Sequence, residues 1–320
     1  MRPAAANGGW IYRDHPGAAA VGQLVSDWYA SRHAHSSRQQ WQARLAAGEI
    51  TCNGRRLVAD RPLAAGDRLA WHRPAWVEAA VPASWAVLHD DGDLHVIAKP
   101  SGLPVLPAGG FLDHTVLRLL EQRHGPDPAG VPRPVHRLGR FTSGVLVCAR
   151  RSTTRAWLSQ RLRESTAAGP QMPAACHKLY RALLQPGRLP LAPGGQLELT
   201  TPIGRRPHAR LGRIWCAADP TDPAALAARS RLTLLERRAD ADLVAVAIAS
   251  GRPHQIRIHC AAAGAPLLGD PLYGPGGLAR AGALPGDGGY RLHALTLRLC
   301  RPDGTPLELT APAPPDLLAP

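Results

Sequence analysis

The chain is poor in aromatic residues and in lysine. Phenylalanine, tryptophan and tyrosine together make up only 5% of the 320 residues, so alanine, leucine and valine must build most of any core. Lys99 and Lys178 are the only two lysines, and arginine therefore carries nearly all of the positive charge. The formal net charge of +14 favours a polyanionic partner such as nucleic acid.

Paired cysteines and long apolar runs are also missing. The six cysteines stand singly with no C-x-x-C pair, which argues against zinc and indicates buried free thiols. No run approaches the roughly 20 apolar residues that a membrane helix needs. Residues 1–17 lack the apolar core of a secretory signal. We therefore expect a cytoplasmic protein that binds no metal and no membrane.

Residues 1–75 predict a small α/β domain. Two segments with helical spacing, 21–32 and 36–48, precede short strands that are joined by an Asn-Gly turn and an Ala-Gly-Asp turn. This order resembles the alpha-L RNA-binding motif of ribosomal proteins, which implies an RNA-binding domain; a cap domain with merely solvated arginines is the alternative. The basic residues that the resemblance places at RNA are Arg38, Arg44 and Arg55.

Residues 76–86 predict a linker, and residues 87–320 predict a second, larger domain. Short segments of apolar alternation, bounded by glycine, proline or aspartate, dominate the region from residue 134 to residue 300. Helices are expected at 113–125, at 152–165 and directly after His254–Arg257. Many strands with few helices predict an α+β fold with a large, mostly antiparallel mixed sheet, because a doubly wound fold would alternate strand and helix more strictly.

Four motifs follow one another in this second region. They are HRLGRFTSG from His136, KLYRA from Lys178, TPIGR from Thr201, and GRPHQIRIH with a later GDPLYG from Gly251. In order and spacing the series resembles the RluA-type RNA pseudouridine synthases. The resemblance implies isomerisation of uridine to pseudouridine in ribosomal or transfer RNA, through base flipping and without metal or cofactor.

The resemblance also implies roles for single residues. Tyr180 matches the tyrosine that stacks on the target uracil and helps with its C5 proton. Arg257 matches the arginine that pairs with the family's catalytic aspartate. Arg137 matches the arginine that enters the RNA helix where the flipped base has left. Other basic residues of the motifs that we expect to contact RNA are Arg140, Lys178 and Arg252.

Gly139 departs from the family pattern, because the family has its catalytic aspartate at this position. Glycine offers no nucleophile, acid or base, so Arg257 must bind RNA phosphate or pair with another acid. Three hypotheses follow: a different carboxylate reaches the site, substrate or water supplies the missing group, or the protein is a silent RNA-binding or assembly protein. We favour a monomeric enzyme. The candidate carboxylates are Asp113, Asp270, Asp90, Asp91 and Asp93.

Overall fold

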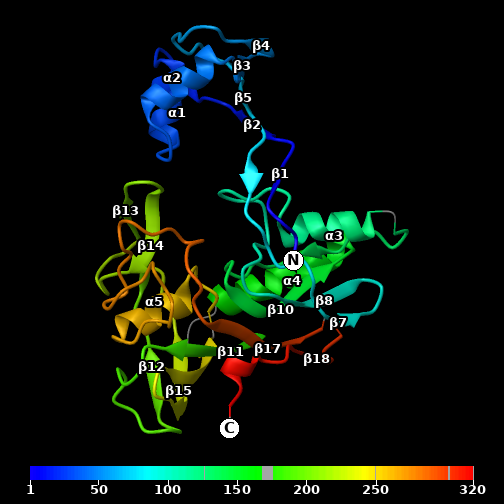
Figure 1. Cartoon of the computed structure of the whole chain (residues 1–320), viewed down its shortest axis with the longest axis vertical. Helices are drawn as coiled ribbons and strands as arrows, with labels where there is room; N and C mark the ends of the chain where they lie inside the picture. Colours follow the sequence, from blue (N-terminus) through cyan, green and yellow to red (C-terminus); the bar gives the residue numbers. More distant parts are fainter. Residues whose placement is uncertain (126, 168–175, 249, 302, 320) are drawn as a thin grey trace. The chain divides into compact units, whose positions relative to one another are not determined.

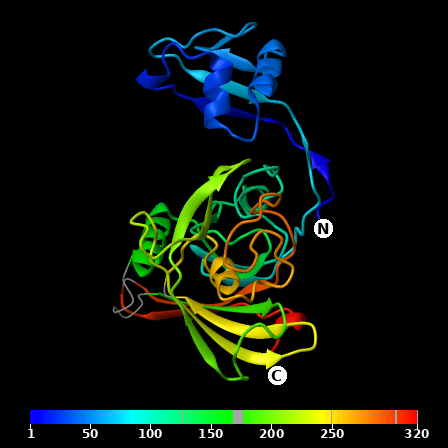
Figure 2. The same cartoon turned by 90° about the vertical axis from the view of Figure 1, so that its left-hand side faces the viewer.

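The computed structural model describes residues 1–125, 127–167, 176–248, 250–301 and 303–319. The chain divides into two compact units, which Figures 1 and 2 show from two sides. The smaller unit comprises Ala4–Glu78 and Pro207–Ile214. The larger unit comprises Met1–Pro3, Ala79–Arg206 and Trp215–Pro320.

The smaller unit contains the two predicted helices and a four-stranded antiparallel sheet. Its strands lie in the order β2-β5-β3-β4, and the predicted Asn-Gly turn joins β3 to β4. A capping box starts α2, in which the Ser37 hydroxyl accepts from the Gln40 N–H and the Gln40 side chain accepts from the Ser37 N–H. The elements are β1 (Ala5–Ala6), β2 (Trp10–Asp14), η1 (Ala18–Ala20), α1 (Val25–Arg32), α2 (Arg38–Ala46), β3 (Ile50–Cys52), β4 (Arg55–Arg56), β5 (Leu69–Arg73) and β6 (Val77–Glu78).

The segment expected to be a linker is partly built into regular pairing. Its residues Val77–Glu78 form β6, which pairs with β1. Val81 is fully buried, and its carbonyl accepts a hydrogen bond of 2.8 Å from the Arg2 N–H. The sequence does not reveal this pairing, because the partner residues lie at the start of the chain.

The larger unit is built on a ten-stranded mixed sheet. Its main path runs β12-β15-β16-β11-β17-β10-β8-β7, with β18 on β17 and β9 on β10. Among the described strands of this sheet only β10 and β17 pair in parallel, which confirms the predicted α+β fold. The strands are β7 (Val87–Asp90), β8 (Leu94–Lys99), β9 (Arg133–Pro134), β10 (Thr142–Ala149), β11 (Cys176–Leu184), β12 (Gln196–Leu199), β13 (Ile203–His208), β14 (Gly212–Ala217), β15 (Ser230–Arg237), β16 (Asp242–Ile248), β17 (Leu292–Cys300) and β18 (Pro306–Thr310); β13 and β14 form a separate hairpin.

Strand β10 lies between two helices and is buried along its whole length. Val145 and Val147 share a core cluster with Leu158 of α4 (Ser152–Ala167). Leu146 and Cys148 point the other way and pack with α3 (Val116–His124). Three apolar residues of α3, Val116, Leu119 and Leu120, are all buried.

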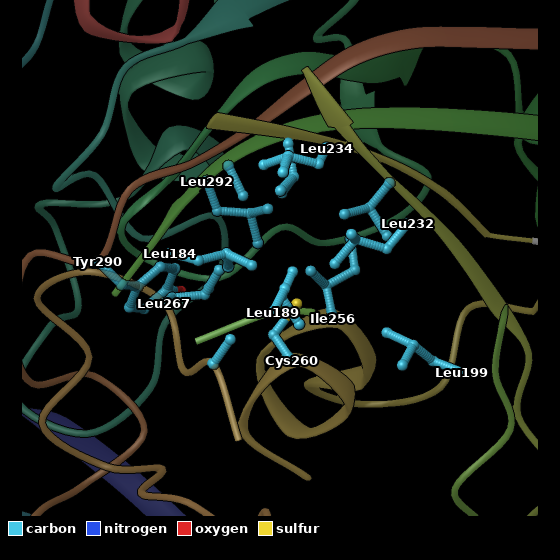
Figure 3. Close-up of a cluster of buried hydrophobic side chains, with 14 of the residues drawn as sticks. Leu184, Leu189, Leu199, Leu232, Leu234, Ile256, Cys260, Leu267, Tyr290 and Leu292 are labelled. Atoms are coloured by element: carbon cyan, nitrogen blue, oxygen red, sulfur yellow. The ribbon is translucent and has the colours of Figure 1, made fainter. Parts of the chain in front are cut away.

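A second core cluster joins helix α5 (Gln255–Ala262) to the other half of the sheet. In Figure 3 Ile256 and Cys260 of α5 meet Leu232 and Leu234 of β15, and Tyr290 lies at one end of the cluster. The expectation that this helix follows His254–Arg257 was wrong: α5 begins at Gln255 and includes Arg257. The chain ends with a short helix, η2 (Pro315–Leu317).

None of the described helices is both long and apolar enough to cross a bilayer. The described residues also contain no group of three or more histidine, cysteine or acidic side chains placed to hold a metal ion. All six cysteines are free thiols, and only Cys300 is exposed.

Candidate active site

Three of the four motifs meet at one open pocket of about 660 Å³ in the larger unit. The loop before β10, the strand β11, the start of α5 and the strand β17 supply its walls. The remaining motif, TPIGR from Thr201, lies outside the pocket lining. The lining includes Tyr180 and Arg257, and its basic side chains are Arg137, Arg163, Lys178, Arg252 and Arg257.

His136 fixes the loop that carries the first motif. The N–H of Val147 in β10 donates to Nε2 of His136 at 3.1 Å, and the Val147 carbonyl accepts from the N–H of Val135 at 3.0 Å. Burial lowers the pKa of His136 to about 4, so the imidazole is neutral at pH 7 and its nitrogen can accept this bond. His136 therefore has a structural role, with the Val147 N–H as its partner.

Two further residues hold the ends of the same loop. The buried Lys99 amine donates to the carbonyls of Leu103 at 2.7 Å and Arg140 at 3.0 Å. Gly144 closes the motif where β10 passes β17: a Cβ there would lie 2.1 Å from the Ala294 carbonyl oxygen, and its φ is +108°. Only glycine fits where the two strands approach so closely, which explains why the motif ends in glycine.

Tyr180 lies on β11 at the wall of the pocket. The pairing of β11 with β17 shifts register between Leu179 and Tyr180, and such bulges re-aim a side chain. Burial raises the pKa of Tyr180, so its phenol stays neutral at pH 7. Burial also lowers the pKa of Lys178 on the same strand. A neutral phenol ring next to basic groups suits a planar uracil held by stacking.

Arg257 has an acid partner. Its Nε donates to Oδ2 of Asp270 at 2.7 Å, and its Nη2 donates to Oδ1 at 2.7 Å. Burial acts to lower the pKa of Arg257, but the Asp270 hydrogen bond and the neighbouring tyrosines outweigh burial and raise it. Of the two alternatives for this arginine, pairing with another acid is therefore confirmed.

The candidate carboxylates are not among the described residues that line the pocket. No described residue that lines it is aspartate or glutamate. Asp270 also binds the N–H groups of Leu272 and Tyr273 through Oδ1, and Asp90 binds Arg150 and lies 2.8 Å from the His95 ring nitrogen. None of the acids proposed from the sequence is among the described residues that line the pocket, and the hypothesis that one of them replaces the missing aspartate stays a prediction.

Tyr290 fills the space that a side chain at position 139 would take. A Cβ built on Gly139 would lie 2.2 Å from the Tyr290 hydroxyl oxygen and 3.2 Å from Oγ1 of Thr142. Gly139 has no positive φ, so its backbone does not require glycine. The glycine is needed for space. Tyr290 was missed in the sequence because it precedes a strand far from the motif, and only proximity in the fold connects the two.

The remaining basic residues fall into different surroundings. Arg137 and Arg252 line the pocket, and so does Arg163, which sequence reasoning missed. Arg140 does not: its Nε donates to the Gly102 carbonyl at 3.0 Å, and its guanidinium lies over two phenylalanine rings. This side chain holds loops together.

In the smaller unit the three arginines also differ. Arg55 is exposed, and Arg38 pairs with Asp27 at 2.8 Å. The Arg44 guanidinium lies 4.2 Å from the Trp41 ring and 4.4 Å from the Trp71 ring. Arg44 thus braces the aromatic core of the unit.

The larger unit thus combines a mixed sheet with a basic pocket that holds a neutral tyrosine and an arginine–aspartate pair, an arrangement that suits a polyanionic ligand such as RNA. The sequence model of the RNA pseudouridylate synthase family matches residues 93–262, and the chain belongs to this family.

Curated relatives agree with this assignment. An uncharacterized RNA pseudouridine synthase of Synechocystis is 42% identical, over 92% of this chain and 95% of its own. RNA pseudouridine synthase 5 of Arabidopsis thaliana is 35% identical, over 92% of this chain and 89% of its own. Ribosomal large subunit pseudouridine synthase D of Xanthomonas campestris is 36% identical, over 72% and 66%. The expectation of a pseudouridine synthase is therefore confirmed.

Solved structures support the fold. The human RNA pseudouridylate synthase domain containing 1 superimposes with a TM-score of 0.54 at 22% identity, covering 75% of this chain and 89% of that one. The human RNA pseudouridylate synthase domain containing 4 superimposes with a TM-score of 0.52 at 24% identity, covering 72% of this chain and 90% of that one.

Proposed function

We propose that the protein isomerises uridine in structured RNA, either ribosomal or transfer RNA, after flipping the base into the pocket of the larger unit. The observation that carries this proposal is the arrangement of five basic side chains around Tyr180 in one open pocket. Removing a base from its stack costs a few kcal/mol, and phosphate contacts made by basic residues offset that cost. The name of the Xanthomonas relative favours ribosomal RNA.

Each site residue has a proposed role. Tyr180 stacks on the uracil and, as a neutral phenol, donates a hydrogen bond to it. Arg137, which is exposed at the pocket, enters the RNA helix in place of the flipped base, since a planar guanidinium stacks well. Lys178 and Arg252 contact the backbone near the target. Arg257 orders the pocket wall through Asp270.

The smaller unit adds affinity for RNA. We assign residues 1–75 to an RNA-binding domain, 76–86 to the connection and 87–320 to the catalytic domain. Arg38 and Arg55 are the proposed contacts, because their charges face solvent. Arg44 supports the fold of the smaller unit around those contacts, and Arg140 supports the loops of the larger unit.

The test is release of tritium from RNA labelled at uridine C5. Total RNA from a strain that lacks the gene is the substrate, since its target uridine is unmodified. Release that depends on the protein supports the proposal, and no release on such RNA contradicts it. Sedimentation of the purified protein tests whether it is a monomer, and cell fractionation tests the cytoplasmic location.

A silent RNA-binding or assembly protein is the second candidate. The observation in its favour is that none of the described side chains lining the pocket carries a carboxylate. This candidate predicts salt-sensitive RNA binding without any change of uridine. Mapping pseudouridines with and without the gene separates the two: one site that vanishes on deletion and returns with the gene eliminates the silent protein.

A further inference from the structure

The hydroxyl of Tyr290 takes the place of the carboxylate that is missing at position 139. A Cβ on Gly139 would lie 2.2 Å from this oxygen and 3.6 Å from the Cζ atom that carries it. The first atom of an aspartate side chain and the phenolic oxygen would therefore compete for one volume at the pocket wall. Both Gly139 and Tyr290 line the pocket.

The ring of Tyr290 is fixed, whereas its oxygen has little to bind. The side chain is only 2% exposed and ends the core cluster shown in Figure 3. The ring meets Phe141 edge to face at 5.9 Å. Within the described part of the chain, the hydroxyl has one recorded hydrogen bond, of 3.4 Å, with Oγ1 of Thr142. This long contact leaves the oxygen available to a ligand.

A cationic group lies against the ring of Tyr290. The Arg257 guanidinium lies 4.2 Å from the centre of the ring. Asp270 binds this guanidinium through two hydrogen bonds of 2.7 Å and offsets part of its charge. A fixed positive charge in a site of restricted solvent access stabilises an oxyanion that develops during a reaction.

We propose that Tyr290 is a catalytic residue whose phenolic oxygen does the work of the absent carboxylate, an inference that rests on the isomerase function proposed above. Tyrosine is a known nucleophile at an anomeric carbon in some glycosidases. The same chemistry fits the first bond change that pseudouridine formation requires, which is cleavage between C1′ of the ribose and N1 of uracil.

The steps balance with no added reactant. The phenolic oxygen bonds to C1′, the C1′–N1 bond breaks with its electron pair going to uracil, and the phenolic proton moves to uracil N1. After the free base turns over, C5 bonds to C1′ and the C1′–oxygen bond breaks with its electron pair returning to Tyr290. The phenolate then takes the C5 proton, which restores the double bond of the base and the phenol.

The experiment measures tritium release from the C5-labelled total RNA by three proteins. Tyr290→Phe removes only the reacting oxygen and keeps the ring. Tyr273→Phe is the matched control: its ring also lies against Arg257, at 5.1 Å, but its hydroxyl donates to the Trp215 carbonyl, lies 2.7 Å from Nδ1 of His254, and is not part of the pocket lining. Affinity for the same RNA and the thermal midpoint are measured for each protein.

We expect Tyr290→Phe to slow release at least about 100-fold with unchanged RNA affinity, and Tyr273→Phe to stay within about threefold of the wild type. A fluorinated tyrosine at position 290, whose phenol is more acidic, should shift the pH–rate profile to lower pH. Equal release by wild type and Tyr290→Phe overturns the role of Tyr290 and leaves the isomerase intact. No release by a wild-type protein that still binds the RNA overturns both.

Discussion

Adding one methyl group at position 139 should destabilise the protein, and removing one oxygen from Tyr290 should cancel that effect. In Gly139→Ala the new Cβ would sit 2.2 Å from the Tyr290 hydroxyl, far inside contact distance. The ring has little freedom to move, because Phe141 and Arg257 lie against it. The loop is held as well, since Lys99 binds the Arg140 carbonyl. Overpacking of this kind costs about 1–3 kcal/mol.

The double variant removes the clash. With phenylalanine at 290 the nearest ring atom, Cζ, lies 3.6 Å from the new methyl, which is ordinary contact. Tyr290→Phe alone loses only the 3.4 Å contact with Thr142, which we expect to cost no more than about 1 kcal/mol. Urea unfolding of the wild type, both single variants and the double variant should therefore give a favourable coupling of about 1–3 kcal/mol. Single-variant costs that simply add up in the double variant would refute the proposed contact.

Three further predictions follow from the described contacts. Burial lowers the pKa of His259 from 6.5 to about 4, so on acidification the unfolded chain takes up a proton before the folded chain does. Relative to His259→Gln, the wild type should therefore lose roughly 3 kcal/mol of unfolding free energy between pH 7 and pH 4. Parallel curves of unfolding free energy against pH for the two proteins would contradict this. Arg137→Ala should reduce the slope of log RNA affinity against log salt concentration by about one. Arg188 is exposed and lies outside the pocket, so Arg188→Ala should leave this slope unchanged. Arg44→Ala should destabilise the smaller unit by about 1–2 kcal/mol through its two tryptophan contacts, while Arg55→Ala should weaken RNA binding at unchanged stability; thermal unfolding and RNA titration of both variants measure this.

The sequence predicts the elements of the larger unit well, because its strands follow local rules. Strand β10 contains the apolar run 145–149 and is buried on both faces, while α3 carries apolar residues at helical spacing. The start of α5 was harder to predict. His254 adopts a left-handed conformation with φ of +55° directly before the helix, and nothing local in the sequence indicates that non-glycine residue as the turning point.

Site residues could be predicted from the sequence only where their motif resembles a motif of the family. Tyr180, Arg137 and Arg257 could be placed by resemblance, and all three line one pocket. The oxygen of Tyr290 beside Gly139 could not be predicted, because the contact joins the loop before β10 to a residue just before β17, far along the chain. The same holds for Arg44, whose charge predicts a solvent contact although two tryptophan rings surround it.

The pairing of Arg257 with Asp270 explains how the fold tolerates glycine at position 139. A buried arginine whose only acid partner is lost destabilises a protein by about 3–5 kcal/mol. Here Asp270 makes two 2.7 Å hydrogen bonds to the guanidinium and is held in turn by backbone N–H groups. The counter-ion of Arg257 thus comes from a different loop than the one that carries Gly139. Loss of the acid at 139 leaves no orphaned charge, and the freed volume is open to the hydroxyl of Tyr290.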